Sequence, residues 1–304
     1  MQAQGCASCA IDGLGGMQMA DVSVIGTGAM GGALVEAFAA AGAEVAVWNR
    51  TRGKAEALTG PGVRVGDSVA EVLASSSMTI LSVSDHEVAR DLVGEVGQET
   101  GVEVVASTSF ATAEQARAFD TELAANGARY LDVAIPGYPS DVRSGDGIFF
   151  VSGDRAAYES HGEWFERIGR TVFVAEAPGA AFTSEMAVVL GYLPMAVGLL
   201  QGLRICETQN LSAESFKAMA LELYPSHIRR LFDRVSKQPD PATRDVEASM
   251  DVWAQGVEEY LVYLRDMGQD TGMYQALHRL FSAASEAGHG DADWTNVAEH
   301  VATP

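Results

Sequence analysis

Residues 21–51 read DVSVIGTGAMGGALVEAFAAAGAEVAVWNRT, and this stretch decides the fold. A short β-branched run at 21–25 leads directly into the glycine-rich residues 26–31, and an apolar helical pattern follows up to residue 42. A second apolar run at 44–49 closes the unit. A strand, a glycine turn, a helix and a second strand within about 30 residues are typical of a dinucleotide-binding βαβ unit.

The glycines of this turn have separate tasks, which explains their spacing. Gly26 permits the tight turn out of the strand, Gly28 lets the backbone approach a pyrophosphate, and Gly31 lets the helix pack close to the sheet. The helix N-terminus also presents free N–H groups and its positive dipole end to the phosphates. The predicted cofactor contacts in this turn are Gly26, Thr27, Gly28, Ala29, Met30 and Gly31.

The end of the second strand indicates which dinucleotide binds. NAD enzymes usually carry an Asp or Glu there, which binds the ribose hydroxyls. This chain has Asn49, Arg50 and Thr51 instead, and Arg52 and Lys54 place three cations within five residues. Arg50 can grip a 2′-phosphate with its planar fork, and Asn49 and Thr51 can donate hydrogen bonds to it. We therefore predict NADPH, bound through Asn49, Arg50, Thr51 and Lys54; a solvated basic loop is the alternative.

The alternation of strands and helices continues to residue 178 and predicts a Rossmann domain over 20–178. Further strands are expected at 77–83, 102–108, 128–135, 147–153 and 171–176, with helices at 111–127 and 154–169. Active groups of such domains lie at the carboxyl ends of the strands. This rule selects three stretches: 83–84, 107–109 and 136–138.

The second half of the chain has no strand signals and predicts an all-helical domain over 179–304. A helix at about 180–208 is apolar on nearly every side, which is the pattern of a buried interdomain helix. Helices are also expected at 212–224, 225–237, about 242–267 and 272–287. Because a small domain cannot cover such a helix alone, we expect an obligate homodimer.

Composition excludes several other classes of protein. A net charge of −21 repels phosphate backbones, so nucleic acid is not an expected partner. No unbroken run of 18 apolar residues or secretory leader is present, so no membrane association and a cytoplasmic location are expected. Residues 1–19 are interpreted as a flexible extension whose Cys6 and Cys9 form an incidental pair, and no histidine spacing indicates a metal site.

Four segments carry a resemblance to a known family: 26–58, SVSD at 82–85, LDVAIPGYP at 131–139 and MGQDTGMYQALHRLFSAASEAGHGD at 267–291. Together they resemble imine reductases, which belong to the β-hydroxyacid dehydrogenase and 6-phosphogluconate dehydrogenase group. The resemblance implies reduction of a C=N bond in a cyclic imine or iminium by NADPH. It also implies cofactor contacts at Val83 and Ser84, and a domain-swapped dimer with its active site between one subunit's Rossmann domain and the other's helices.

The resemblance places four residues at the reacting centre. Glu185 occupies the position at which hydroxyacid dehydrogenases carry a catalytic Lys, and a carboxylate there suits a cationic iminium or could protonate an imine. Ser107, Ser109 and Tyr138 match positions close to the nicotinamide or the substrate. The residue roles have alternatives: Glu185 as a helix-start carboxylate without a catalytic role, Ser107 and Ser109 as satisfied turn hydroxyls, and Tyr138 as turn packing. The function has two alternatives: a 3-hydroxyacid-type dehydrogenase and a catalytically weak NADPH-binding protein.

Overall fold

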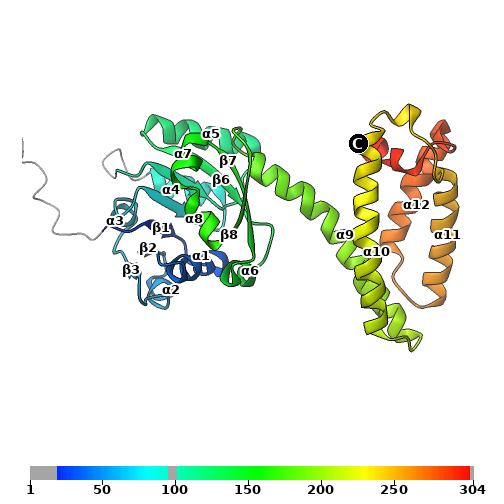
Figure 1. The fold of residues 1–304 in the computed structure, drawn as a ribbon, viewed down its shortest axis with the longest axis horizontal. Coiled ribbons are helices and arrows are strands. Elements are labelled where there is room, and N and C mark those ends of the chain that lie inside the picture. Colours follow the sequence, from blue (N-terminus) through cyan, green and yellow to red (C-terminus); the bar gives the residue numbers. More distant parts are fainter. Residues whose placement is uncertain (1–18, 95–100, 302–304) are drawn as a thin grey trace, which may run out of the picture. The chain divides into compact units, whose positions relative to one another are not determined.

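The computed structural model describes residues 19–94 and 101–301 (Figure 1). The predicted extension and its cysteines therefore lie outside the described residues, apart from Met19. The chain divides into two compact units between Leu190 and Gly191, a point that lies inside helix α9 (Ala180–Thr208).

The first unit is built on one eight-stranded sheet with the order β3-β2-β1-β4-β5-β6-β7-β8. All neighbouring strands are parallel except β6 and β7, which are antiparallel. The first six strands thus have the order 3-2-1-4-5-6 of a dinucleotide-binding sheet. The strands are β1 (Val22–Ile25), β2 (Val45–Trp48), β3 (Val63–Val65), β4 (Met78–Leu81), β5 (Val104–Ser107), β6 (Arg129–Ala134), β7 (Gly147–Gly153) and β8 (Gly169–Ala175).

Helices cover both faces of this sheet. They are α1 (Ala29–Ala40), α2 (Arg52–Glu56), α3 (Val69–Leu73), α4 (His86–Gly94), α5 (Ala113–Ala125), α6 (Pro139–Ser144), α7 (Arg155–His161) and α8 (Glu163–Ile168). The strand β3 and the short helices α2, α3 and α6 were not predicted. The single helix expected at 154–169 was also wrong: the chain divides at Gly162, where an added Cβ would lie 2.6 Å from the Tyr158 carbonyl oxygen.

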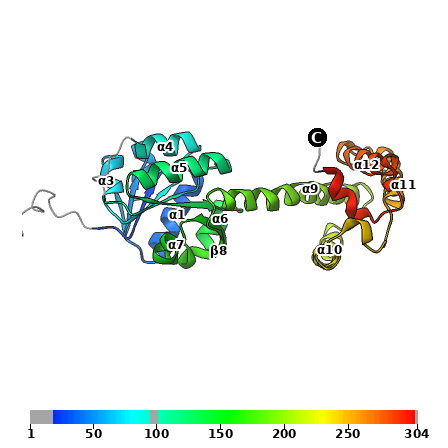
Figure 2. The ribbon, with the colours of Figure 1, turned by 90° about the horizontal axis from the view of Figure 1, so that it is seen from above.

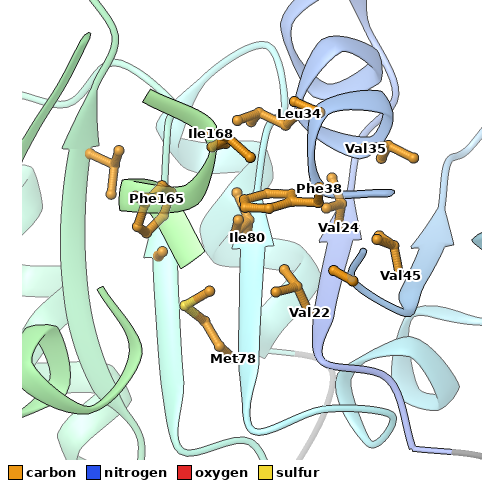
Figure 3. Close-up of a cluster of buried hydrophobic side chains, with 14 of the residues drawn as sticks. Val22, Val24, Leu34, Val35, Phe38, Val45, Met78, Ile80, Phe165 and Ile168 are labelled. Atoms are coloured by element: carbon orange, nitrogen blue, oxygen red, sulfur yellow. The ribbon is translucent and has the colours of Figure 1, made fainter. Parts of the chain in front are cut away.

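The hydrophobic core has one layer on each face of the sheet. Helices α4 and α5 lie on one face, and α1 and α7 lie on the other (Figure 2). On the α1 face, Phe38 of α1 packs edge-on against Phe165 of α8, with ring centroids 6.2 Å apart (Figure 3). On the other face, Phe119 of α5 packs edge-on against Tyr130 of β6. Because the sheet is buried on both sides, its carboxyl edge is held rigidly.

The second unit consists of the rest of α9 with α10 (Ala213–Lys237), α11 (Met250–Asp266) and α12 (Gly272–Ala284). Its core joins α11 and α12 through Met250, Val257, Phe281 and Ala284. The short elements η2 (Pro241–Thr243), η3 (Ser285–His289), η4 (Trp294–Val297) and α13 (Ala298–Val301) complete it.

Two predictions for the second unit were wrong. The expected break at residue 225 does not occur, because Pro225 lies inside the continuous helix α10 and the Ser226 hydroxyl donates to the Leu223 carbonyl oxygen at 2.7 Å. The helix expected from residue 242 begins only at Met250, since Ser249 caps it. Residues 244–249, which precede it, are not helical. In this segment Arg244 is 8% exposed and donates to Thr295 and Asn296.

Apolar side chains on α9 and α10 remain exposed in the chain. Within the second unit they include Leu193, Val197, Leu200, Met219, Leu221 and Phe232. By length and composition alone α9 is apolar enough to cross a membrane, although its sequence has no unbroken run of 18 apolar residues. One such helix is weak evidence, because the core helices of soluble proteins pass the same test.

Candidate functional site

A cleft of about 460 Å³ opens at the carboxyl ends of β1, β2 and β4. This is the edge at which doubly wound sheets bind their ligands. Its walls come from the glycine turn, the end of β2, the turn after β4 and the start of α4. The lining residues are Gly26, Gly28, Ala29, Met30, Gly31, Trp48, Asn49, Arg50, Lys54, Ser82, Val83, Ser84, Val88, Leu92 and Thr108.

The glycine turn is fixed by close backbone approaches. Gly26 has φ of +98°, and a Cβ there would lie 2.2 Å from the Ser82 carbonyl oxygen. A Cβ on Gly31 would lie 2.0 Å from the Gly26 carbonyl oxygen, so α1 must start close against the strand end. Gly28 differs, since a Cβ there would meet no described atom within 4 Å. Gly28 therefore borders open space in the cleft, where a bound group can approach the backbone.

The first turn of α1 is prepared for an anion. Its N-cap residue is Gly28, which offers no capping side chain, and the turn contains no acidic residue. The first N–H groups of the helix therefore have no intrahelical acceptor and lie where the cleft is lined by Ala29 and Met30. This arrangement fits a pyrophosphate group.

The end of β2 presents two cations that no described residue neutralises. Arg50 and Lys54 line the cleft and make no ion pair within residues 19–94 and 101–301. Arg52, by contrast, is bound by Glu56 at 2.8 Å and Asp67 at 2.7 Å. The predicted group of three cations thus supplies two that are free for a ligand phosphate. Among the described residues, no carboxylate lines the cleft to repel such a phosphate.

Asn49 has a structural task as well as a position in the cleft. Its Oδ1 accepts a hydrogen bond from the Thr27 N–H at 3.1 Å, and its Nδ2 donates to the Thr51 carbonyl oxygen at 2.9 Å. Asn49 therefore braces the glycine turn against the basic turn. Thr27 is 7% exposed, and neither Thr27 nor Thr51 lines the cleft. Their predicted direct contacts with the cofactor stay predictions.

Several lining residues were missed by sequence reasoning. Trp48 ends β2, so the strand-end rule could have found it. Ser82 and Thr108 follow β4 and β5 and lie in the segments 82–85 and 107–109 that the sequence singled out, although neither was named as a contact. Val88 and Leu92 lie one turn apart on α4 and form an apolar wall. Their helical spacing reads as ordinary core packing, which carries no signal for a ligand.

Ser107 and Ser109 lie at the end of β5 but are buried within the sheet. Ser107 is fully buried and its hydroxyl accepts from the Ser109 N–H at 3.3 Å. The Ser109 hydroxyl donates to the Val83 carbonyl oxygen at 3.1 Å. A direct contact with substrate would require these side chains to leave their buried positions, whereas Thr108 between them lines the cleft.

Tyr138 lies in the turn after β6 and is 64% exposed. Its backbone N–H donates to Asp141 Oδ2 at 2.7 Å, which fixes the start of α6. The side chain does not line the cleft described above. Its predicted place at the substrate therefore stays a prediction.

Glu185 lies in the second turn of α9 and is half-buried. Removal from water raises the pKa of its carboxyl above the ordinary range. The side chain makes no ion pair within the described chain. It is thus a carboxyl whose ionised form would gain from a nearby cation. No three metal-ligating side chains cluster anywhere in the described residues.

Both halves of the chain match known protein families. Residues 21–176 match the family described as the NAD binding domain of 6-phosphogluconate dehydrogenase. Residues 177–303 match the C-terminal domain of the NADPH-dependent reductive aminase-like family. The chain therefore belongs to the dinucleotide-binding family of 6-phosphogluconate dehydrogenase, within the branch that carries a reductive aminase-like C-terminal domain. The fold class and the resemblance stated from the sequence are confirmed, while domain swapping stays a prediction.

Individual relatives agree with this placement. The chain is 22% identical to the NADPH-dependent reductive aminase of Aspergillus oryzae, over 92% of this chain and 96% of that protein. It is 26% identical to a Streptomyces aurantiacus imine reductase, with a TM-score of 0.84 over 92% of this chain and 99% of the other. An imine reductase from Myxococcus stipitatus in complex with NADP⁺ is also 26% identical, with a TM-score of 0.80 over 92% and 99%.

Proposed function

We propose that the protein is an NADPH-dependent reductase of C=N bonds, acting on cyclic imines or on iminium ions. The observation that carries the cofactor preference is that Arg50 and Lys54 make no ion pair with any described residue and that no described carboxylate lines their cleft. The observation that carries the substrate class is Glu185, a half-buried carboxyl without a cationic partner in the described chain. The likeness to imine reductases and a reductive aminase supports both.

The cleft residues have distinct tasks in this proposal. The turn at Gly28 and the first N–H groups of α1 hold the pyrophosphate. Arg50 forms a forked contact with the 2′-phosphate, and Lys54 adds a second positive charge. When bound, NADPH supplies the hydride that adds to the carbon of the C=N bond. Thr108, at the end of β5, lies at the cleft wall, and Val83 and Ser84 border the cofactor after β4.

Glu185 acts on the nitrogen side of the substrate. An ionised carboxylate in a partly dry site favours the iminium form, and this lowers the barrier to hydride addition at the carbon. A Lys at this position would repel the same cation, and hydroxyacid chemistry needs such a positive proton donor. Glu185 therefore favours imines over hydroxyacids as substrates.

The test is the oxidation of NADPH at 340 nm with two substrates that differ in charge. One is 3,4-dihydroisoquinoline, which is a neutral imine when unprotonated, and the other is its N-methyl iminium, which is always a cation. If Glu185 stabilises the cation, Glu185→Gln lowers kcat/KM for both substrates by roughly 100-fold. Glu207→Gln, on the same helix but in an exposed pair with Arg204, is the matched control. Full activity of Glu185→Gln on both substrates would overturn the role of Glu185.

We also propose that the protein is a homodimer in which a second copy covers the apolar faces of α9 and α10. Leu193, Val197 and Leu200 lie at helical spacing along α9 and are exposed in the single chain. Monomeric soluble proteins rarely leave a large contiguous apolar surface in water. Light scattering should give twice the chain mass of 32.0 kDa. Leu200→Asp should shift the protein toward the monomer and reduce turnover, and a monomeric wild type would contradict the proposal.

A further inference from the structure

Asp132 of β6 is a fully buried carboxyl that the proposed chemistry does not use. The only other buried carboxyl among the described residues, Asp293, is paired with Arg234 at 2.8 Å. Asp132 has no cationic partner in the part of the chain that the structure describes. Its Oδ2 accepts a hydrogen bond from the Ser152 hydroxyl of β7 at 3.0 Å. A buried carboxylate without a cation is costly, so its surroundings need an explanation.

The groups around Asp132 belong to the beginning of α9. Burial raises the pKa of Asp132, and the Ser152 hydroxyl and the nearby backbone N–H groups of Gly179, Ala181 and Phe182 only partly oppose this rise. The Ala181 N–H also donates to the Ser152 hydroxyl oxygen at 3.0 Å. These N–H groups come from the first turn of a helix, where no intrahelical acceptor exists. The Ser152 hydroxyl thus supplies an acceptor for the Ala181 N–H, and Asp132 Oδ2 holds that hydroxyl from the other side. Asp132 Oδ1 has no hydrogen-bond partner among the described residues.

The same turn is fixed on two further sides. Gly179 has φ of +89°, and a Cβ there would lie 2.6 Å from the Ala113 Cα at the start of α5. The side chains of Ala181 and Phe182 are buried against Ala134 and Phe150 of the sheet. The start of α9 therefore has little freedom to rotate or slide on the sheet.

Glu185 lies four residues after Ala181 and so on the same face of α9, about 6 Å further along the axis. A rotation of the first turn would carry Glu185 around the helix axis with it. We propose that Asp132 and Ser152 together anchor the first turn of α9 and thereby position Glu185 for the reaction proposed above. Asp132 is then a positioning residue, and the inference depends on the proposed function only for the kinetic consequence.

The experiment compares the full-length wild type with Asp132→Asn, Ser152→Ala and the conservative Ser152→Thr. Asp91→Asn, an exposed carboxyl on α4, is the control. Hydrogen exchange of the peptide covering residues 180–186 is measured at pH 7.5. We expect about tenfold faster exchange in Asp132→Asn and Ser152→Ala, and near wild-type exchange in Ser152→Thr and Asp91→Asn. Unchanged exchange in both Asp132→Asn and Ser152→Ala would overturn the proposal.

Two further readouts separate positioning from general damage to the fold. NADPH affinity should stay within twofold of wild type, because no residue of the cleft is altered. The carboxyl ¹³C resonance of Glu185, assigned with Glu185→Gln, should report a changed pKa in Asp132→Asn, since a displaced side chain has a different exposure. An unchanged Glu185 pKa would overturn positioning even if the helix end exchanges faster.

The kinetic arm tests the link to catalysis. Asp132→Asn should lower kcat for the imine by about tenfold and leave KM for NADPH unchanged. A wild-type kcat in Asp132→Asn would overturn its role in the reaction. If the wild-type protein reduces no imine, the proposed function fails, while the exchange and pKa readouts still decide whether Asp132 positions Glu185.

Discussion

Replacing Asp132 by Asn should change the pH dependence of stability by an amount that follows from its burial. Burial raises the pKa of Asp132 from its ordinary 3.8 to about 6. Between these values the folded protein binds more protons than the unfolded chain, so the stability that Asp132 contributes at low pH is lost as the pH rises through about 6. At neutral pH the ionised carboxyl therefore costs about 3 kcal/mol of folding free energy relative to its protonated form.

Asparagine has nearly the same shape and does not titrate, so the variant lacks this loss. The difference in unfolding free energy between wild type and Asp132→Asn is followed against pH. Any part of this difference that does not depend on pH then drops out. From pH 5, just above the isoelectric point of about 4.5, to pH 7.5, the variant should gain about 1.4 kcal/mol relative to wild type. Tyr130, the titratable neighbour on the same strand, has a pKa raised well above its ordinary value and does not ionise in this range.

The assay is urea unfolding followed by hydrogen exchange of peptides from β4 to β6, which isolates the first unit from the second. Asp91→Asn should show no such gap, because this carboxyl is exposed. A gap between wild type and Asp132→Asn that stays constant from pH 5 to pH 7.5 would refute the reasoning, since it would mean that the buried carboxyl ionises as it does in water.

Three shorter predictions concern the cleft and the reacting carboxyl. Gly31→Ala should destabilise the fold by about 3 kcal/mol or more in urea titrations, because the added methyl group would lie 2.0 Å from the Gly26 carbonyl oxygen; a stable variant would contradict this. Arg50→Ala should weaken NADPH binding by 10- to 100-fold, measured by fluorescence titration, while NADH binding stays within about threefold. Arg52→Ala should have little effect, since Arg52 is already paired, and equal losses in both variants would count against the assignment. Because burial raises the pKa of Glu185, kcat/KM for a permanently charged iminium should fall on the acid side at a higher pH than an ordinary carboxyl gives, and Glu185→Gln should remove this limb.

The sequence was informative where local patterns decide the structure. The glycine turn at 26–31 and the strand periods specify the cleft, because backbone approach and alternation leave few other solutions. The lack of a carboxylate at Asn49 could be read directly, but the sequence did not show that Arg52 is neutralised by Asp67, which is fifteen residues away along the chain. Ion pairs of this kind depend on tertiary contacts.

Errors in the second half have a common physical cause. A proline usually ends a helix, yet α10 continues through Pro225 because one lost hydrogen bond costs less than breaking a helix of 25 residues. The start of α11 at Met250 depends on Arg244 and its buried partners, a contact between segments about fifty residues apart. Helical periodicity alone contains no information about such contacts.

Asp132 shows why buried polar residues escape sequence reasoning and yet bear on function. In the sequence it is one acid in an otherwise apolar strand, and an alternation rule would place it on a wet face. The structure buries it instead, where its Oδ2 accepts from the Ser152 hydroxyl and that hydroxyl oxygen accepts from the Ala181 N–H in the first turn of α9. A carboxyl that costs free energy at neutral pH without any cation is hard to explain by folding alone, since an apolar or amide side chain would be cheaper. The proposed anchoring of α9 explains its presence: Asp132 holds the Ser152 hydroxyl against the first turn of the helix that carries Glu185, so its role is in positioning rather than in stability.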